Sequence, residues 1–228
     1  MIENKKEFFL GAVMMALFIG VMVIFFSPVF NGTNGLQHLD SLYNSISKGS
    51  AYYIPTVQEK VKTLTGKPLD LNMAVEDESQ AARLAVILQK SGAEATAEGK
   101  KIKVKGDLGG LIMAGLADAD LMYHNDGKPI SDRYGIAEKQ VLYDWWRFNK
   151  NTVKELNKKE QFKEGLILTE VNSKAIETAY NYYKIEAKKI TSCVGIVSFS
   201  LIFYVIYTMW YGYAILFMFE GWGLKFGH

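Results

Sequence analysis

The sequence predicts a membrane protein of the α/β (α+β) class, with one transmembrane helix near each end and a soluble domain between them. Two observations predict the helices: residues 8–30 and residues 190–219 contain no Asp, Glu, Lys or Arg. About 20 helical residues, each rising about 1.5 Å, cross the hydrocarbon core of a bilayer, so each stretch is long enough to span it. A third observation, the strand and helix patterns between residues 69 and 123, predicts the class of the soluble domain.

These stretches divide the chain into five parts. In order they are a short cytoplasmic tail (1–7), the first transmembrane helix (8–30), the soluble domain (31–189), the second transmembrane helix (190–219) and a short C-terminal tail (220–228). A cleaved secretory signal is the alternative for the first helix, because Lys5 and Lys6 precede it. However, the apolar run exceeds the roughly 7 to 15 residues of a signal core, and residues 27–30 offer no small-x-small cleavage site. We therefore expect a retained anchor.

The lysines near the two helices bear on membrane topology. Lys5 and Lys6 favour a cytoplasmic N-terminus, which places the soluble domain outside the cytoplasm, in the periplasm or the extracellular space. Lys184, Lys188 and Lys189 precede the second helix and favour the opposite orientation. Because long domains translocate largely regardless of charge, the extracytoplasmic placement is preferred and the cytoplasmic one stays open. The one cysteine of the chain allows no intrachain disulfide and does not mark a redox compartment.

The soluble domain begins its regular pattern at residue 69. Apolar and polar residues alternate over 69–75, which predicts a strand, and Asp77 is placed to cap the helix that follows. Gly92 ends that helix. The next elements are a hairpin with strands over 93–97 and 101–105 and a second helix over 108–123. This is the order of a split βαβ (ferredoxin-like) core, and we expect residues 166–171 to supply its closing strand.

Additional helices are expected around this core. Apolar residues recur at helical spacing over 36–46, 55–64, 137–156 and 173–183. In the helix over 137–156, Trp146 falls off the apolar stripe to which Trp145 and Phe148 belong. Nothing between residues 184 and 190 breaks a helix, so we expect the helix over 173–183 to run into the second transmembrane helix with at most a slight kink.

No arrangement of residues predicts catalysis, and we expect no enzyme activity. Metal or haem ligation needs clustered ligands, whereas the three histidines, His38, His124 and His228, are far apart in the sequence. The candidates for acid–base chemistry are the carboxylates of Asp70, Asp118 and Asp120. We expect these to be solvated surface groups, as most carboxylates are. No serine lies in a Gly-x-Ser-x-Gly elbow, and we expect neither a metal nor any other cofactor.

A glycine-rich turn over residues 106–110, Gly-Asp-Leu-Gly-Gly, lies between a predicted strand and a predicted helix. Backbone amides at such a helix start are suited to bind phosphate, but the sequence fits neither the Walker A motif nor the dinucleotide fingerprint. Close packing of the helix against the sheet is the preferred interpretation. The formal net charge of +2, and aromatics that do not alternate with basic residues, give no indication of a nucleic-acid partner.

The second transmembrane helix is unusually rich in aromatic residues, and its tyrosines fall on one helical stripe. A phenol in hydrocarbon needs a hydrogen-bond partner, which predicts packing against other helices. Small residues of the first helix permit close approach, and Glu220 is either a proton-relay group or, preferably, a residue at the membrane boundary. The predicted partner-helix interface comprises Tyr204, Tyr207, Trp210, Tyr211, Glu220, Gly11 and Gly20.

Together these features favour a non-catalytic accessory or structural subunit of a larger membrane complex. Its partners would be other membrane protein subunits and the lipid bilayer. The first alternative is an extracytoplasmic ligand-binding or sensory module that acts through a partner. The second alternative is a membrane enzyme or electron-transfer subunit whose aromatic helix contacts a quinone, although the sequence offers no ligand set for such a role.

Overall fold

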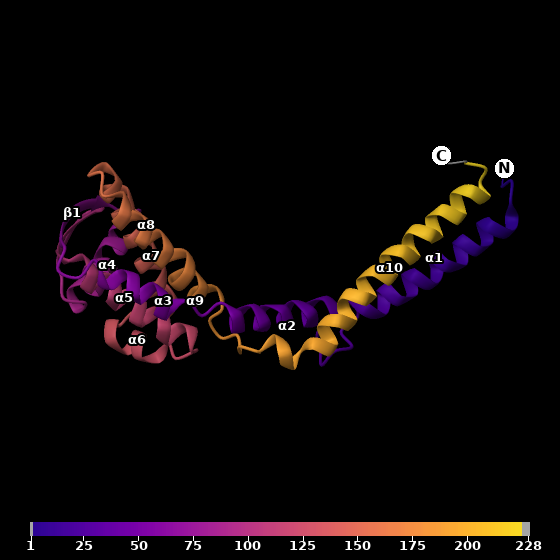
Figure 1. The fold of residues 1–228 in the computed structure, drawn as a ribbon, viewed down its shortest axis with the longest axis horizontal. Helices are drawn as coiled ribbons and strands as arrows, with labels where there is room; N and C mark the ends of the chain where they lie inside the picture. Colours follow the sequence, from indigo (N-terminus) through magenta and orange to yellow (C-terminus); the bar gives the residue numbers. More distant parts are fainter. Residues whose placement is uncertain (1, 225–228) are drawn as a thin grey trace. The chain divides into compact units, whose positions relative to one another are not determined.

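The computed structural model describes residues 2–224, and in this range the chain is mostly helical with one small sheet (Figure 1). It divides into two units. The hairpin unit comprises residues 2–47 and 188–224, and the α+β unit comprises Lys48–Ala187. The predicted C-terminal tail lies partly outside the described residues.

Two long helices form the hairpin unit. α1 (Lys5–Phe26) and α10 (Val194–Gly221) run antiparallel and side by side (Figure 1). At about 1.5 Å per residue, α1 is about 33 Å long and α10 is about 42 Å long. The Asn4 side chain caps α1 by accepting from the amide of Lys6. α1 ends before the predicted residue 30, because Ser27 precedes a proline and so adopts extended backbone.

Both helices are long and apolar enough to cross a membrane. Only 6% of the most apolar 18-residue window of each helix is buried inside the chain. A core helix of a water-soluble protein would instead be covered by its neighbours. Most of the apolar surface of these two helices is therefore exposed in the structure.

A shorter helix, α2 (Gly35–Ser50), packs against the beginning of α10. Leu42 and Ile46 of α2 are buried with Cys193, which directly follows the short 3₁₀ helix η2 (Ile190–Ser192). The Tyr43 hydroxyl lies 2.7 Å from the hydroxyl of Ser200. The first turns of α10 thus pair with α2 instead of α1, which accounts for the greater length of α10. Most of α2 groups with the hairpin unit, although the sequence-based boundaries put it in the soluble domain.

The α+β unit is built on a three-stranded antiparallel sheet. β1 (Pro68–Ala74) and β2 (Glu94–Glu98) flank β3 (Lys101–Asp107) in the order β1-β3-β2. α4 (Glu78–Lys90) connects β1 to β2, and α5 (Leu108–Tyr123) follows β3. The predicted order of strand, helix, strand, strand, helix is therefore confirmed, as is the cap of α4, where Asp77 accepts from the amide of Gln80 at 2.7 Å.

The predicted closing strand over residues 166–171 is wrong, because these residues belong to α8 (Phe162–Val171). Gly165, Leu168 and Val171 are buried at a spacing of three, whereas Leu166 is 68% exposed. A short apolar run fits a strand or a helix equally well, and only the longer period distinguishes them. Among residues 2–224 the sheet therefore has three strands, and the ferredoxin-like arrangement is not completed.

The helices that contact this sheet are α4, α5 and α7 (Glu138–Lys158). The other helices of the unit pack on these and share the same core: α3 (Ile54–Lys62), α6 (Lys128–Tyr134), α8, the π-helical segment η1 (Asn172–Ile176) and α9 (Glu177–Asn181). Trp145 and Phe148 of α7 are fully buried in the common core, with Leu71, Ile102 and Val104 from the sheet.

The expected continuous helix into the second transmembrane helix is also wrong, since α9 ends at Asn181 and α10 begins at Val194. Lys184 has a left-handed backbone with φ of 67°, and its amide donates to the side-chain oxygen of Asn125 at 2.8 Å. The carbonyl oxygens of Tyr182 and Ile185 accept from Lys48. Side chains from distant segments thus bind backbone groups that a continued helix would use itself.

Candidate functional sites

The register of the hairpin is set by three contacts between α1 and α10. A Cβ at Gly11 would lie 2.7 Å from the carbonyl oxygen of Ala214, so only glycine permits this approach of the two backbones. The indole nitrogen of Trp210 donates to the carbonyl oxygen of Met14 at 3.0 Å. Towards the other end, the Phe25 ring stacks on the Phe203 ring at 6.0 Å. Trp210 of α10 therefore lies beside the middle of α1 and not beside either of its ends.

Three tyrosines of α10, Tyr204, Tyr207 and Tyr211, form what we term the tyrosine patch. The Phe18 ring of α1 lies 5.4 Å from the Tyr211 ring and 6.4 Å from the Tyr207 ring, and the Tyr204 and Tyr207 rings meet edge to face at 5.5 Å. Tyr204 is 57% exposed and Tyr211 is 45% exposed. Within residues 2–224, none of the three hydroxyls has a hydrogen-bond partner.

The other predicted interface residues are dispersed. Gly11 and Trp210 are used inside the hairpin, whereas a Cβ at Gly20 would meet no atom within 4 Å. Glu220 is exposed in the last turn of α10. Lys225, which follows the second helix in the sequence, lies outside the described residues. Gly11 and Trp210 thus lie between α1 and α10 at separate contacts, whereas Gly20 and Glu220 lie on the outside.

The glycine-rich turn is occupied by its own aspartate. The Asp107 carboxylate accepts from the amides of Gly66 at 2.8 Å, Gly109 at 3.2 Å and Gly110 at 3.1 Å. These are the amides that a phosphate would need. A Cβ at Gly109 would lie 2.6 Å from the backbone carbon of Leu64, so this glycine permits close packing of α5 against the end of α3.

Asp118 is not the solvated surface group that the sequence predicts. Its carboxylate is fully buried and accepts from the Trp145 indole at 2.8 Å, the Tyr134 hydroxyl at 2.9 Å and the Arg133 guanidinium at 2.8 Å. Burial raises the pKa of Asp118, against the lowering effect of these donors. Because every donor comes from the protein itself, the carboxylate joins α5, α6 and α7 and is not open to a substrate. Asp120 is partly exposed, and its carboxylate accepts from the Tyr52 hydroxyl at 2.7 Å.

The histidines do not gather. Across residues 2–224, no group of three or more His, Cys, Asp or Glu side chains is placed to hold a metal ion. His38 stacks on the Phe30 ring at 5.5 Å, and His124 lies 3.4 Å from the Asp120 carboxylate. His228 is outside the described residues.

Lys48, at the beginning of the α+β unit, is a buried cation that the sequence analysis did not single out. It is 2% exposed, and its ammonium donates to Asn125 Oδ1 at 2.8 Å and to the carbonyl oxygens of Ile185 at 2.7 Å and Tyr182 at 3.1 Å. The Tyr123 hydroxyl donates to the Lys48 carbonyl oxygen. Burial lowers the pKa of Lys48. The side chain fixes the segment that follows α9 against the end of α5.

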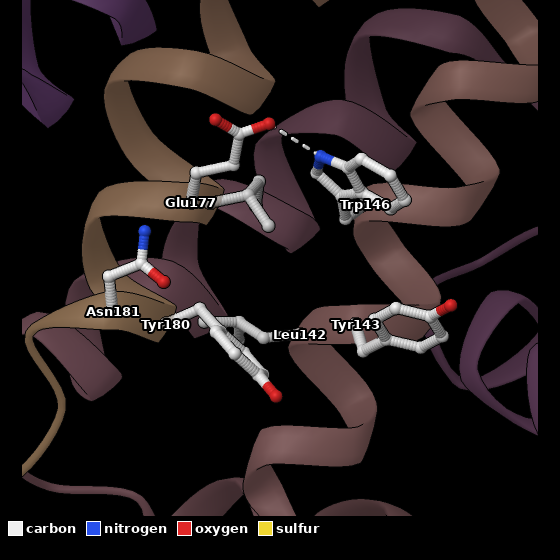
Figure 2. A pocket seen from close by; sticks show the side chains of 7 residues that line it. Leu142, Tyr143, Trp146, Glu177, Tyr180 and Asn181 are labelled. Atoms are coloured by element: carbon white, nitrogen blue, oxygen red, sulfur yellow. Dashed lines mark hydrogen bonds between the residues drawn. The ribbon is translucent and has the colours of Figure 1, made fainter.

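A cavity of about 280 Å³ between α7 and α9 was also missed. In Figure 2, Tyr143 and Trp146 come from α7, and Glu177, Tyr180 and Asn181 come from α9. Leu142 and Ile176 complete the lining. The indole nitrogen of Trp146 donates to Glu177 Oε1 at 2.7 Å. We call this cavity the aromatic pocket. Its one signal in the sequence was Trp146, which falls off the core-facing stripe of its helix.

No protein-family model, no curated protein and no solved structure matches this chain. The fold and these sites therefore define its class by structure alone: a mostly helical protein with two candidate membrane-spanning helices and a small three-stranded sheet.

Proposed function

We propose that the chain is a two-span membrane protein that serves as a non-catalytic docking subunit of a larger membrane complex. Membrane insertion is supported by the length, composition and exposure of α1 and α10. Docking is supported by the tyrosine patch, whose occupant in this proposal is a transmembrane helix of another subunit.

The observation that carries the proposal is the pair of unpartnered hydroxyls on Tyr207 and Tyr211. Both rings contact Phe18, which lies about 12 Å along the helix axis from the end of α1 at Phe26. At that depth lipid tails offer no hydrogen-bond acceptor, and the backbones of α1 and α10 are bonded internally. A neighbouring helix with an exposed side-chain oxygen or a free carbonyl would supply acceptors, each worth about 0.6 to 2 kcal/mol.

Tyr204 supports docking less strongly than Tyr207 and Tyr211 do, because it lies nearer the end of α1. It follows Phe203, which stacks on Phe25 near the end of α1, so its hydroxyl is within reach of lipid headgroups. The patch therefore extends from the membrane interface inward, with Tyr207 and Tyr211 as the two deeper members.

In the proposed topology both ends of the chain face the cytoplasm and the α+β unit lies outside it. Lys5 and Lys6 support this orientation, and Lys184, Lys188 and Lys189 oppose it. Protease added to intact spheroplasts tests it. Digestion of the α+β unit without lysis fits the proposal, whereas digestion only after lysis places the unit in the cytoplasm.

The docking role is tested by the double variant Tyr207→Phe/Tyr211→Phe, purified from membranes in a mild detergent. We expect the wild type to retain a membrane protein in fixed stoichiometry and the double variant to lose it. Tyr213→Phe is the matched control, since Tyr213 is similarly exposed but lies two residues from Tyr211 on another side of the helix. Equal retention by all three proteins would contradict docking through these hydroxyls.

A ligand-binding role for the α+β unit is the second candidate function. The aromatic pocket favours it, because the pocket is concave, mostly apolar and supplied with a few polar groups, as small-molecule sites are.

A further inference from the structure

Three aromatic rings, those of Tyr143, Trp146 and Tyr180, line the aromatic pocket. The Tyr143 and Trp146 rings on α7 are nearly parallel, with centroids 6.0 Å apart, and the Tyr180 ring enters from α9 (Figure 2). The face of an aromatic ring is electron-rich and attracts a cation placed within about 6 Å of the centroid. Two elements, α7 and α9, therefore contribute aromatic rings to one cavity.

The charged group that lines the pocket would also attract a cation. Glu177 contributes a carboxylate, and no Lys, Arg or His side chain is part of the lining. One of its oxygens, Oε1, accepts from Trp146 at 2.7 Å, which fixes the carboxylate beside the indole ring. Among the described residues, nothing donates to its other oxygen.

The same rings already attract cations of the chain itself. The ammonium of Lys150 lies 4.6 Å from the centroid of the Trp146 ring, and that of Lys139 lies 5.0 Å from the centroid of the Tyr180 ring. Neither lysine lines the cavity.

The backbone beside the pocket is held by buried amides. Asn172 donates to the Trp146 carbonyl oxygen at 3.1 Å and accepts from Asn149 at 2.8 Å. Asn172 begins the π-helical segment η1, which ends at Ile176, one residue before Glu177. Single π-helical turns are frequent at functional sites. This one is joined to α7 at Trp146, so the indole and the carboxylate are positioned together.

We propose that the aromatic pocket binds a small organic cation with an alkylated ammonium group, as choline and tetramethylammonium have. This inference rests on the ligand-binding role named above and adds the chemical class of the ligand. A metal ion would find only one carboxylate here, and an anion would meet the Glu177 charge. The volume of about 280 Å³ is at the small end for ligand sites and suits such a cation.

The test is a titration of the full chain, purified in a maltoside detergent that carries no choline group, with tetramethylammonium or choline followed by ligand-observed NMR. Saturable binding of both cations is expected. The uncharged isostere 3,3-dimethylbutan-1-ol should bind at least about tenfold more weakly, because it has the same shape without the charge. Dihexanoylphosphatidylcholine, titrated as monomers, shows whether the headgroup of a lipid or a free cation is preferred, and tighter binding of either one supports the inference.

The variant Glu177→Gln should weaken cation binding about tenfold, since it keeps an acceptor for Trp146 and removes the charge. Glu94→Gln is the control, because Glu94 is an exposed residue of β2 away from the pocket. Equal binding of cation and isostere would overturn the cation assignment while leaving a ligand-binding pocket. Absence of binding by every compound would overturn both.

Discussion

The indole nitrogen of Trp210 donates to the carbonyl oxygen of Met14 across 3.0 Å, and this bond joins the middle of α1 to α10. A tryptophan in a membrane protein is often placed at the lipid headgroups, where its N–H stays wet. Here the donor is satisfied inside the hairpin. The hydrogen bond therefore fixes the register that brings Tyr207 and Tyr211 beside Phe18, where their hydroxyls have no hydrogen-bond partner among the described residues.

The hairpin depends on glycine at one position and not at another. Gly11→Val would place its Cβ 2.7 Å from Ala214 O and 2.7 Å from Met218 N, and backbone atoms cannot move aside as a flexible side chain can. We expect a loss of about 1 to 3 kcal/mol in stability, the usual cost of overpacking, measured as a lower melting temperature of the detergent-solubilised chain.

Gly20→Val is the matched control for this variant, because the same substitution in the same helix meets no atom within 4 Å. Its melting temperature should equal that of the wild type. If both variants, or neither, lowered the melting temperature, the packing of α1 on α10 described above would be wrong.

Lys48 should stabilise the α+β unit through its three hydrogen bonds. Lys48→Met keeps the apolar stem but removes the three hydrogen bonds that the ammonium donates to Asn125 Oδ1 and to the carbonyl oxygens of Tyr182 and Ile185. Each of these acceptors keeps one other donor. Relief of the buried charge offsets part of this loss. We expect a net loss of about 2 kcal/mol, or roughly 5 °C in melting temperature.

The exposed Lys103→Met on β3 is the control for Lys48 and should change the melting temperature little. An unchanged or higher melting temperature for Lys48→Met would show that the buried charge costs more than its hydrogen bonds contribute.

Tyr52 gives a pH dependence with a defined sign. Burial and a 2.7 Å hydrogen bond to Asp120 raise its pKa from the ordinary 10.0 to about 12. The folded state therefore holds this proton more tightly than the unfolded state, so the stabilisation is complete below pH 10.0 and is lost as the pH rises through about 12.

The difference in phenolate absorbance between the wild type and Tyr52→Phe isolates this one group. We expect a midpoint near 12 in the difference titration, and a wild type that loses more stability than the variant above pH 10.0. A midpoint at the ordinary value would contradict the hydrogen bond to Asp120.

The elements that the sequence predicted correctly are those with local signals. Asp77 caps α4, and Gly92 follows this helix with φ of 92°. Gly99 forms the turn between β2 and β3 with φ of 55°. Each of these boundaries is therefore encoded within a few residues. The errors have long-range causes. Residues 182–189 leave the helical path because Lys48 and Asn125, distant in sequence, bind their backbone groups.

The candidate sites also divide into those with a local sequence signal and those that depend on long-range packing. The aromatic stripe of α10 was visible in the sequence because Tyr204, Tyr207 and Tyr211 share one helix face. The aromatic pocket was not, because Trp146 and Tyr180 meet only after α7 and α9 pack, and the π-helical segment before Glu177 leaves no recognisable pattern in the sequence.

The mass of the particle extracted from native membranes in mild detergent tests the docking role most directly. Native mass spectrometry should find this 25.7 kDa chain in a larger particle, together with a different membrane protein at a fixed ratio. A particle holding only copies of this chain would contradict the role of a subunit in a mixed complex. A monodisperse particle with a single 25.7 kDa chain would contradict docking altogether.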